Sequence, residues 1–153
     1  MITDQFNRVL KVVKERMEES GIRWAVIGST NMALQGMDVV PRDLDIVVRL
    51  DDLKKIPEIF SDMVAQGVKD LPSMTGEPAW EVNGKIDGVE IQILGEKDTG
   101  QYVSKLINNR VEIVKTSETE IPCFALEAEA DAYAETGREK KANLIREFLR
   151  GSE

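Results

Sequence analysis

Residues 22–49 read IRWAVIGSTNMALQGMDVVPRDLDIVVR and contain two apolar runs, each of which meets a polar motif. The first run ends at Gly28 and Ser29, and the second begins around Asp43 and Asp45. Side chains alternate between the two faces of an extended strand, so Asp43 and Asp45 point to one side and their apolar neighbours to the other. The second run therefore places two carboxylates next to each other at the head of a strand.

The aspartate pair indicates a metal site. Two carboxylates held this close raise each other's pKa unless a cation lies between them. Mg²⁺ is bound by one or two carboxylates together with substrate phosphates, so Asp43 and Asp45 are candidate Mg²⁺ ligands. The alternative is a solvated face of an edge strand. Polar and apolar residues stop alternating at Val47 and Val48, which are both apolar. This favours a buried strand whose end lines a cleft.

The Gly28-Ser29 pair is the candidate phosphate-binding half of the site. A glycine at the end of a buried strand lets the backbone approach a ligand closely. A helix beginning there would present free N–H groups to an anion. Ser29 either contacts a triphosphate or caps the helix, since both roles use the same geometry. Arg42, which precedes the aspartates, is a further candidate for a phosphate contact or an ordinary surface arginine.

The ordered set of an apolar strand, Gly-Ser, a spacer and Asp-apolar-Asp-apolar resembles the signature of the nucleotidyltransferase superfamily typified by DNA polymerase beta, in its minimal and antibiotic-modifying branches. The resemblance covers about residues 22–94. The matching residues are Gly28, Ser29, Asp43, Leu44, Asp45 and Ile46. The resemblance implies an α/β (α+β) fold with a mixed central sheet of about five strands and helices packed on it. It also implies catalysis with two Mg²⁺ ions and a nucleoside triphosphate as substrate.

Members of this superfamily usually carry a third carboxylate on a later strand between apolar residues. Glu90, between Val89 and Ile91, fits that description, and Asp87 is the alternative. The resemblance thus assigns Asp43, Asp45 and Glu90 to metal binding and catalysis. Gly28, Ser29 and Arg42 would bind the nucleotide. A plain solvent-facing glutamate is the competing interpretation of Glu90.

Composition limits the possible functions. A chain of 153 residues predicts a single domain, with a core over about residues 1–115 and a helical part over about 125–150. With 20 basic and 28 acidic residues the net charge is −8, which makes a long nucleic acid an unfavourable partner. No apolar run is long enough to cross a membrane and no signal segment is evident, so a cytoplasmic protein is expected.

The chain has no histidine and one cysteine. Their scarcity excludes a Ser-His-Asp triad and any zinc site built on imidazole or several thiolates. Any metal must therefore be held by oxygen. Cys123 has no evident base partner and is expected to be a small core residue.

The remaining pattern predicts the order of elements. Helices are expected over 3–20, 30–35, 51–67, 101–108, 126–135 and 139–150, and Pro57 could kink the third of them. Strands are expected over 22–27, 43–50, 79–82, 89–94, 111–114 and 121–124. The loop expected over 68–78 could form a flap. Asn83-Gly84 and Asp87-Gly88 are turn signals. The cluster of Arg138, Lys140 and Lys141 is expected to form a solvated face. The alternative, implied by the resemblance alone, is that basic residues of this kind near a tyrosine and a glycine reach the nucleotide.

The sequence therefore favours transfer of a nucleoside monophosphate from a triphosphate to an acceptor hydroxyl. The small size of the chain and its acidity favour a small molecule or a protein as acceptor. The alternative is a catalytically impaired module on the same fold that senses nucleotides or binds a partner, as antitoxins do. Loss of the third carboxylate would favour that alternative.

Overall fold

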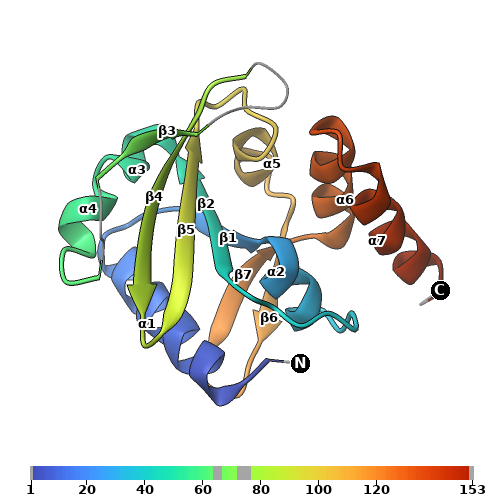
Figure 1. Cartoon of the computed structure of the whole chain (residues 1–153), viewed down its shortest axis with the longest axis horizontal. Coiled ribbons are helices and arrows are strands. Elements are labelled where there is room, and N and C mark those ends of the chain that lie inside the picture. Colours follow the sequence, from blue (N-terminus) through green and yellow to red (C-terminus); the bar gives the residue numbers. More distant parts are fainter. Residues whose placement is uncertain (1, 64–66, 72–76, 152–153) are drawn as a thin grey trace.

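The computed structural model describes residues 2–63, 67–71 and 77–151, and within these ranges the chain forms a seven-stranded sheet flanked by helices (Figure 1). The strand order is β3-β4-β5-β2-β1-β7-β6. The strands are β1 (Trp24–Ile27), β2 (Leu44–Arg49), β3 (Lys69–Leu71), β4 (Ala79–Ile86), β5 (Val89–Glu96), β6 (Val111–Lys115) and β7 (Glu120–Phe124). The helices are α1 (Asp4–Glu19), α2 (Gly28–Leu34), α3 (Leu50–Leu53), α4 (Ile56–Ile59), α5 (Val103–Ile107), α6 (Leu126–Glu135) and α7 (Glu139–Gly151).

The centre of the sheet brings the sequence motifs together. Strand β2 pairs antiparallel with β1, with Ile27 opposite Asp45. On its other side β2 pairs parallel with β5, with Asp45 opposite Gln92. The mixed sheet is confirmed, and the four residues of β1 are all buried, as their apolar run predicts. The end of β1, the head of β2 and the middle of β5 therefore adjoin one another.

Helices cover both faces of the sheet. Helix α1 packs one face through residues at helical spacing, and the side chain of Thr3 accepts a hydrogen bond from the Phe6 N–H at its start. The opposite face packs against α5 and α6. Ile46 of β2 belongs to the α1 side, whereas Val47 belongs to the α5 and α6 side. Because faces alternate along a strand, Asp45 shares the face of Val47 and points toward the C-terminal helices.

Two strand predictions need correction. The loop expected over 68–78 contains the edge strand β3, and residues 72–76 of the flap lie outside the described residues. The Asn83-Gly84 pair is not a turn but lies inside β4, which continues to Ile86. The hairpin turns instead at Asp87 and Gly88, whose φ angles of 48° and 79° suit a two-residue turn. Strand β3 joins the six strand segments expected from the pattern, so the sheet has seven strands rather than about five.

The helix expected over 51–67 is replaced by the short helices α3 and α4, and residues 64–66 lie outside the described residues. Pro57 lies in the first turn of α4, where its missing N–H is tolerated, so it begins a helix instead of kinking one. None of the helices in the described part of the chain combines the length and apolar character needed to cross a bilayer.

Candidate nucleotide-transfer site

Asp45 lies where three cavities meet. The first, the aromatic cavity, is lined by Asp45 with Tyr102 and Tyr133. The second, the acidic cavity, is lined by both aspartates with Asp62 and Glu90. The third, the α2–α7 cavity, lies between those two helices and is again lined by Asp43 and Asp45. The aspartates predicted as metal ligands therefore face open space that could admit a substrate from several sides.

Gly28 lies directly against the Asp45 carboxylate. Its φ is 75°, and a Cβ at this position would lie 2.8 Å from Asp45 Oδ2. The left-handed conformation and the close approach both require glycine. The start of α2 is also tied to the aspartates by Thr30, whose hydroxyl donates to the Asp43 carbonyl at 2.8 Å. The structure thus brings the Gly-Ser turn and the aspartate pair together.

The electrostatics of the pair fit a divalent cation. Burial and the neighbouring charge of Asp43 raise the pKa of Asp45 to about 6, against the opposing effect of Arg138 and Lys141. A cation bound between the two carboxylates would relieve both effects. In the described ranges, no three acidic or thiol side chains are grouped closely enough to hold a metal by themselves. Two carboxylates match the pattern in which Mg²⁺ shares its coordination with substrate phosphates.

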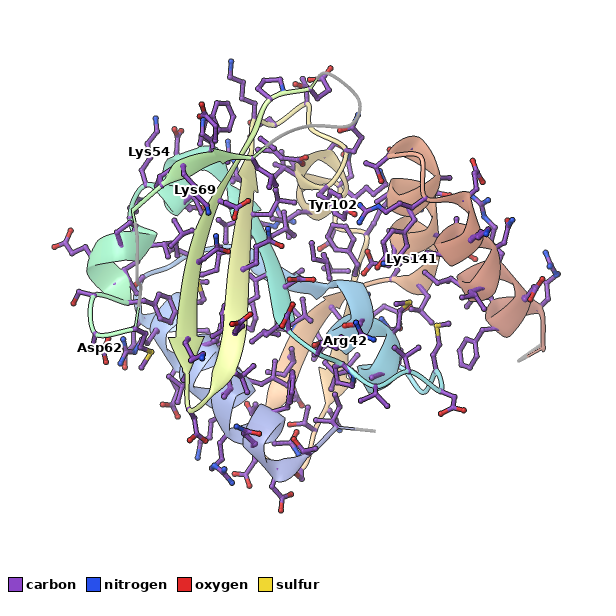
Figure 2. All side chains as sticks on the ribbon, viewed as in Figure 1. Arg42, Lys54, Asp62, Lys69, Tyr102 and Lys141 are labelled. Carbon is purple, nitrogen blue, oxygen red and sulfur yellow. The ribbon has the colours of Figure 1, made fainter. Side chains whose placement is uncertain are left out.

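The α2–α7 cavity collects the residues suited to phosphates. Ser29 and Arg42 line it from the α2 side, and Arg138 and Lys141 line it from the α7 side. Figure 2 shows Arg42 beside α2, Tyr102 beside α5 and Lys141 beside α7. Ser29 is not the helix cap: the N-cap position is Ile27, which makes no side-chain capping bond. Ser29 lines the cavity instead, where it could contact a ligand.

Arg138 is held in place by its neighbours. Its guanidinium donates to the Tyr102 hydroxyl at 2.8 Å and to Thr136 Oγ1 at 3.0 Å. It also stacks on the ring of Tyr133, 4.7 Å from the centroid. Arg138 is half-buried, which differs from the expected solvated face, whereas Lys141 is exposed as expected, and both line a cavity with Asp45. Lys140, between them, is exposed as expected.

Glu90 and Gln92 lie on the same side of β5, and both line the acidic cavity with the aspartates. Glu90 is exposed, and Gln92 is the residue in register with Asp45. Asp87 is elsewhere: it occupies the hairpin turn, where its carboxylate accepts from Arg8 at 3.2 Å. The structure thus brings Glu90, rather than Asp87, to the cavity of the aspartates. Arg49, at the far end of β2, pairs with Asp98 at 2.8 Å.

The chain was compared with known proteins. The family model of aminoglycoside-2''-adenylyltransferase matches residues 9–150. The chain belongs to this family. No curated protein matched it. A crystal structure from Thermotoga maritima, described provisionally as that of a nucleotidyltransferase, is similar with a TM-score of 0.76 and 28% sequence identity, over 99% of this chain and 96% of the other.

Membership in the aminoglycoside-2''-adenylyltransferase family, together with the shared fold, supports nucleotidyl transfer as the general activity. It also confirms the resemblance to nucleotidyltransferases that the Gly-Ser and Asp-x-Asp motifs indicated. The metal ligands, the nucleotide and the acceptor are not identified by these similarities.

In this member of the adenylyltransferase family, an unpredicted glutamate lies beneath the site. Glu129 of α6 is fully buried. Its Oε1 accepts from the Gly28 N–H at 2.6 Å and from Asn31 Nδ2 at 3.0 Å. The Gly28 N–H is therefore engaged inside the protein, which corrects the expectation that it faces a phosphate. Burial raises the pKa of Glu129 to about 7, although the two hydrogen bonds and Arg138 oppose the shift.

We expect Glu129 to make stability depend on pH. Its pKa in the folded protein, about 7, lies above its ordinary value of 4.5. Between these values the folded state holds the extra proton, so stability falls as pH rises through this window and stays low above it. Glu129→Gln should remove this loss, which is at most about 3 kcal/mol. The variant should melt at a higher temperature than the parent at pH 8, with the difference shrinking toward pH 5.

The other charged and titratable groups around Glu129 are the same in the parent and in Glu129→Gln, so their own contributions to the pH dependence of stability cancel when the two proteins are compared. They are Asp45 on β2, Arg138 before α7, Tyr102 before α5, Cys123 on β7 and Tyr133 on α6. Glu127→Gln, an exposed change on the same helix, serves as the control and should leave the melting profile unchanged. A stability difference between Glu129→Gln and the parent that is equal at pH 5 and pH 8 would contradict the expectation.

Proposed function

We propose that this protein transfers adenylate from ATP to a hydroxyl group of a small molecule that carries amines. The observation that supports this best is the position of Asp43 and Asp45 between two cavities that differ in the number of cationic side chains lining them. The α2–α7 cavity contains three cationic side chains suited to a triphosphate. The acidic cavity on the other side suits a cationic acceptor.

The nucleotide would lie with its triphosphate near Ser29, Arg138 and Lys141. Arg138 is already oriented by Tyr102 and Tyr133, so little side-chain freedom is lost when it binds an anion. Asp43 and Asp45 would hold Mg²⁺, for which they supply oxygen ligands of the right kind. When bound, two Mg²⁺ ions would stabilise the attacking and the leaving oxygen of the transfer.

The acceptor would enter through the acidic cavity. Asp43, Asp45 and Glu90 line it together with Asp62, which is paired with Arg16 at 2.6 Å, and Lys85 is the single cation among the described lining residues. Such a cavity favours a positively charged ligand over an anionic one such as a nucleic acid. The family description names aminoglycosides, which carry amines and hydroxyls on one scaffold. An amine-bearing sugar is therefore the proposed acceptor class.

The proposed reaction is a single displacement. The acceptor oxygen forms a bond to the α-phosphorus of ATP while the bond from that phosphorus to the bridging oxygen breaks. Pyrophosphate leaves, and the hydroxyl proton passes to the carboxylate of Glu90, which lines the acceptor cavity. The protein's main contribution is to position the two substrates in line.

The experiment is an assay of pyrophosphate release from ATP with Mg²⁺ and a panel of aminoglycosides, with neutral sugars as controls. Release that depends on one amine-bearing acceptor, with the adenylated product seen by mass spectrometry, is the expected result. A thermal shift across the four nucleoside triphosphates tests the choice of nucleotide. Tight ATP binding without release for any small acceptor would favour the nucleotide-sensing alternative, and labelling of a copurifying protein would favour a protein acceptor.

Arg138→Lys should weaken ATP binding although it keeps the positive charge. Lysine cannot reproduce the planar contacts with Tyr102, Thr136 and Tyr133 that orient the guanidinium. We expect the KM for ATP to rise on the order of tenfold, which corresponds to losing one or two charge-assisted hydrogen bonds. Lys140→Met, at an exposed position two residues further on, is the matched control and should leave the KM unchanged. A normal KM in Arg138→Lys would remove Arg138 from the nucleotide site.

A further inference from the structure

Glu129 occupies a position that packing alone would fill more favourably with an apolar residue. It lies on the buried side of α6, among Leu126, Ala130 and Ala132. Its Oε2 is the one buried side-chain oxygen or nitrogen in the described part of the chain that has no hydrogen-bond partner. A buried carboxyl group without a paired cation is destabilising, since it loses its hydration without full compensation.

Among the described residues, no cation pairs directly with this carboxyl group. Arg138, whose charge acts on Glu129, directs its own hydrogen bonds to Tyr102 and Thr136. The partners of Glu129 are instead two neutral donors, the Gly28 N–H and the Asn31 amide. Both partners belong to α2, which begins the segment between β1 and the aspartates. The carboxyl group is thus directed at the nucleotide side of the site.

The contacts continue from Glu129 to Asp45. Gly28, held by Glu129 through its N–H, has its α-carbon against the Asp45 carboxylate, where no Cβ would fit. Asn31 also donates to the Phe124 carbonyl at 3.0 Å and accepts from Gln35 at 2.7 Å, which anchors α2 to the end of β7. Removing the acceptor oxygen of Glu129 would therefore free the turn that borders Asp45.

We propose that Glu129 is a positioning residue for the nucleotide: it fixes the turn at Gly28 so that Asp45 and Ser29 keep their places around the triphosphate. This inference rests on the proposed function, because it concerns the same site. Glu129 does not touch the substrate. Its role is to hold the turn that carries Ser29 and borders Asp45, at the expense of burying an incompletely paired carboxyl group.

The test separates the acceptor oxygen from the volume of the side chain. Glu129→Gln keeps an oxygen that can accept both hydrogen bonds, whereas Glu129→Met keeps the size and removes the acceptor. We expect the KM for ATP to change by less than about threefold in Glu129→Gln and to rise at least tenfold in Glu129→Met. The KM for the acceptor should stay the same in both variants. Glu127→Met, exposed on the same helix, controls for the change of residue type.

A purely structural role for Glu129 predicts another pattern. Glu129→Met would then lower the melting temperature and the fraction of active protein but leave the KM for ATP of the folded protein unchanged, and this result would overturn the inference. If Glu129→Met does not fold, Glu129→Asp replaces it, since a side chain one methylene shorter cannot reach the Gly28 N–H in the same geometry. A parent protein that binds no ATP by calorimetry would instead refute the proposed function itself.

Discussion

Asp45→Asn is expected to abolish adenylate transfer, with a fall in kcat/KM on the order of 10³-fold or more. The substitution keeps the shape of the side chain but removes the negative oxygen that would bind Mg²⁺ at the meeting point of the three cavities. ATP binding should also lose its dependence on Mg²⁺. Pyrophosphate release and calorimetric titration of ATP with and without Mg²⁺ measure the two effects. Asp43→Asn is expected to act in the same direction.

The fold should survive Asp45→Asn, because burial already disfavours the charged form of this carboxyl group and a neutral amide removes that penalty. An unchanged or higher melting temperature at pH 8 would show that lost activity is not lost structure. Asp70→Asn, an exposed change on the edge strand β3, is the matched control and should be fully active. Mg²⁺-dependent transfer that persists at the parent's rate in Asp45→Asn would rule out the metal assignment.

Gly28→Ala is the second change with a large expected effect. The new Cβ would meet Asp45 Oδ2 at 2.8 Å, and the residue would have to keep a φ of 75°. Such a conformation costs about 1–3 kcal/mol for a residue other than glycine. Relief of the contact must move either the Asp45 carboxylate or the turn held by Glu129. We expect a lower melting temperature together with a fall in kcat/KM on the order of 10²-fold.

Gly21→Ala separates these two consequences. Gly21 has a φ of 66° at the end of α1, and no described atom beyond its own chain neighbours lies within 4 Å of the position its Cβ would take. This control should reproduce the loss of stability without the loss of transfer. If both variants lose activity in proportion to stability, the contact between Gly28 and Asp45 has no special role in the site.

The central part of this fold could be predicted because its signals are local. Unbroken burial of β1 follows from its apolar run, and the shared direction of Asp43 and Asp45 follows from strand alternation. The β4–β5 hairpin was predicted with the wrong boundary because two turn signals, Asn83-Gly84 and Asp87-Gly88, compete within one segment. Pairing of all eight residues of β4 with β5 decides between them. That pairing depends on tertiary context.

The site could be predicted only where its residues adjoin the motifs. Arg138 and Lys141 were expected on a solvated face, because clusters of charged residues usually lie there. Only the return of α7 toward α2 brings them to the cavity that the aspartates line. Glu129 left a weaker signal. It lies three residues from both Leu126 and Ala132, on the apolar side of an alanine-rich helix, where an acidic residue is unusual. Helical spacing could have marked it as buried, but not identified Gly28 as its partner.

The meeting of three cavities at one carboxylate has a thermodynamic consequence. A ligand that neutralises Asp45 from the α2–α7 cavity also changes the electrostatic potential that a second ligand meets in the aromatic and acidic cavities. Occupancy on one side and affinity on the other are then linked by a single coupling free energy, which must be the same in both directions. Titrating one substrate at fixed levels of the other would measure that linkage as a reciprocal change in dissociation constants.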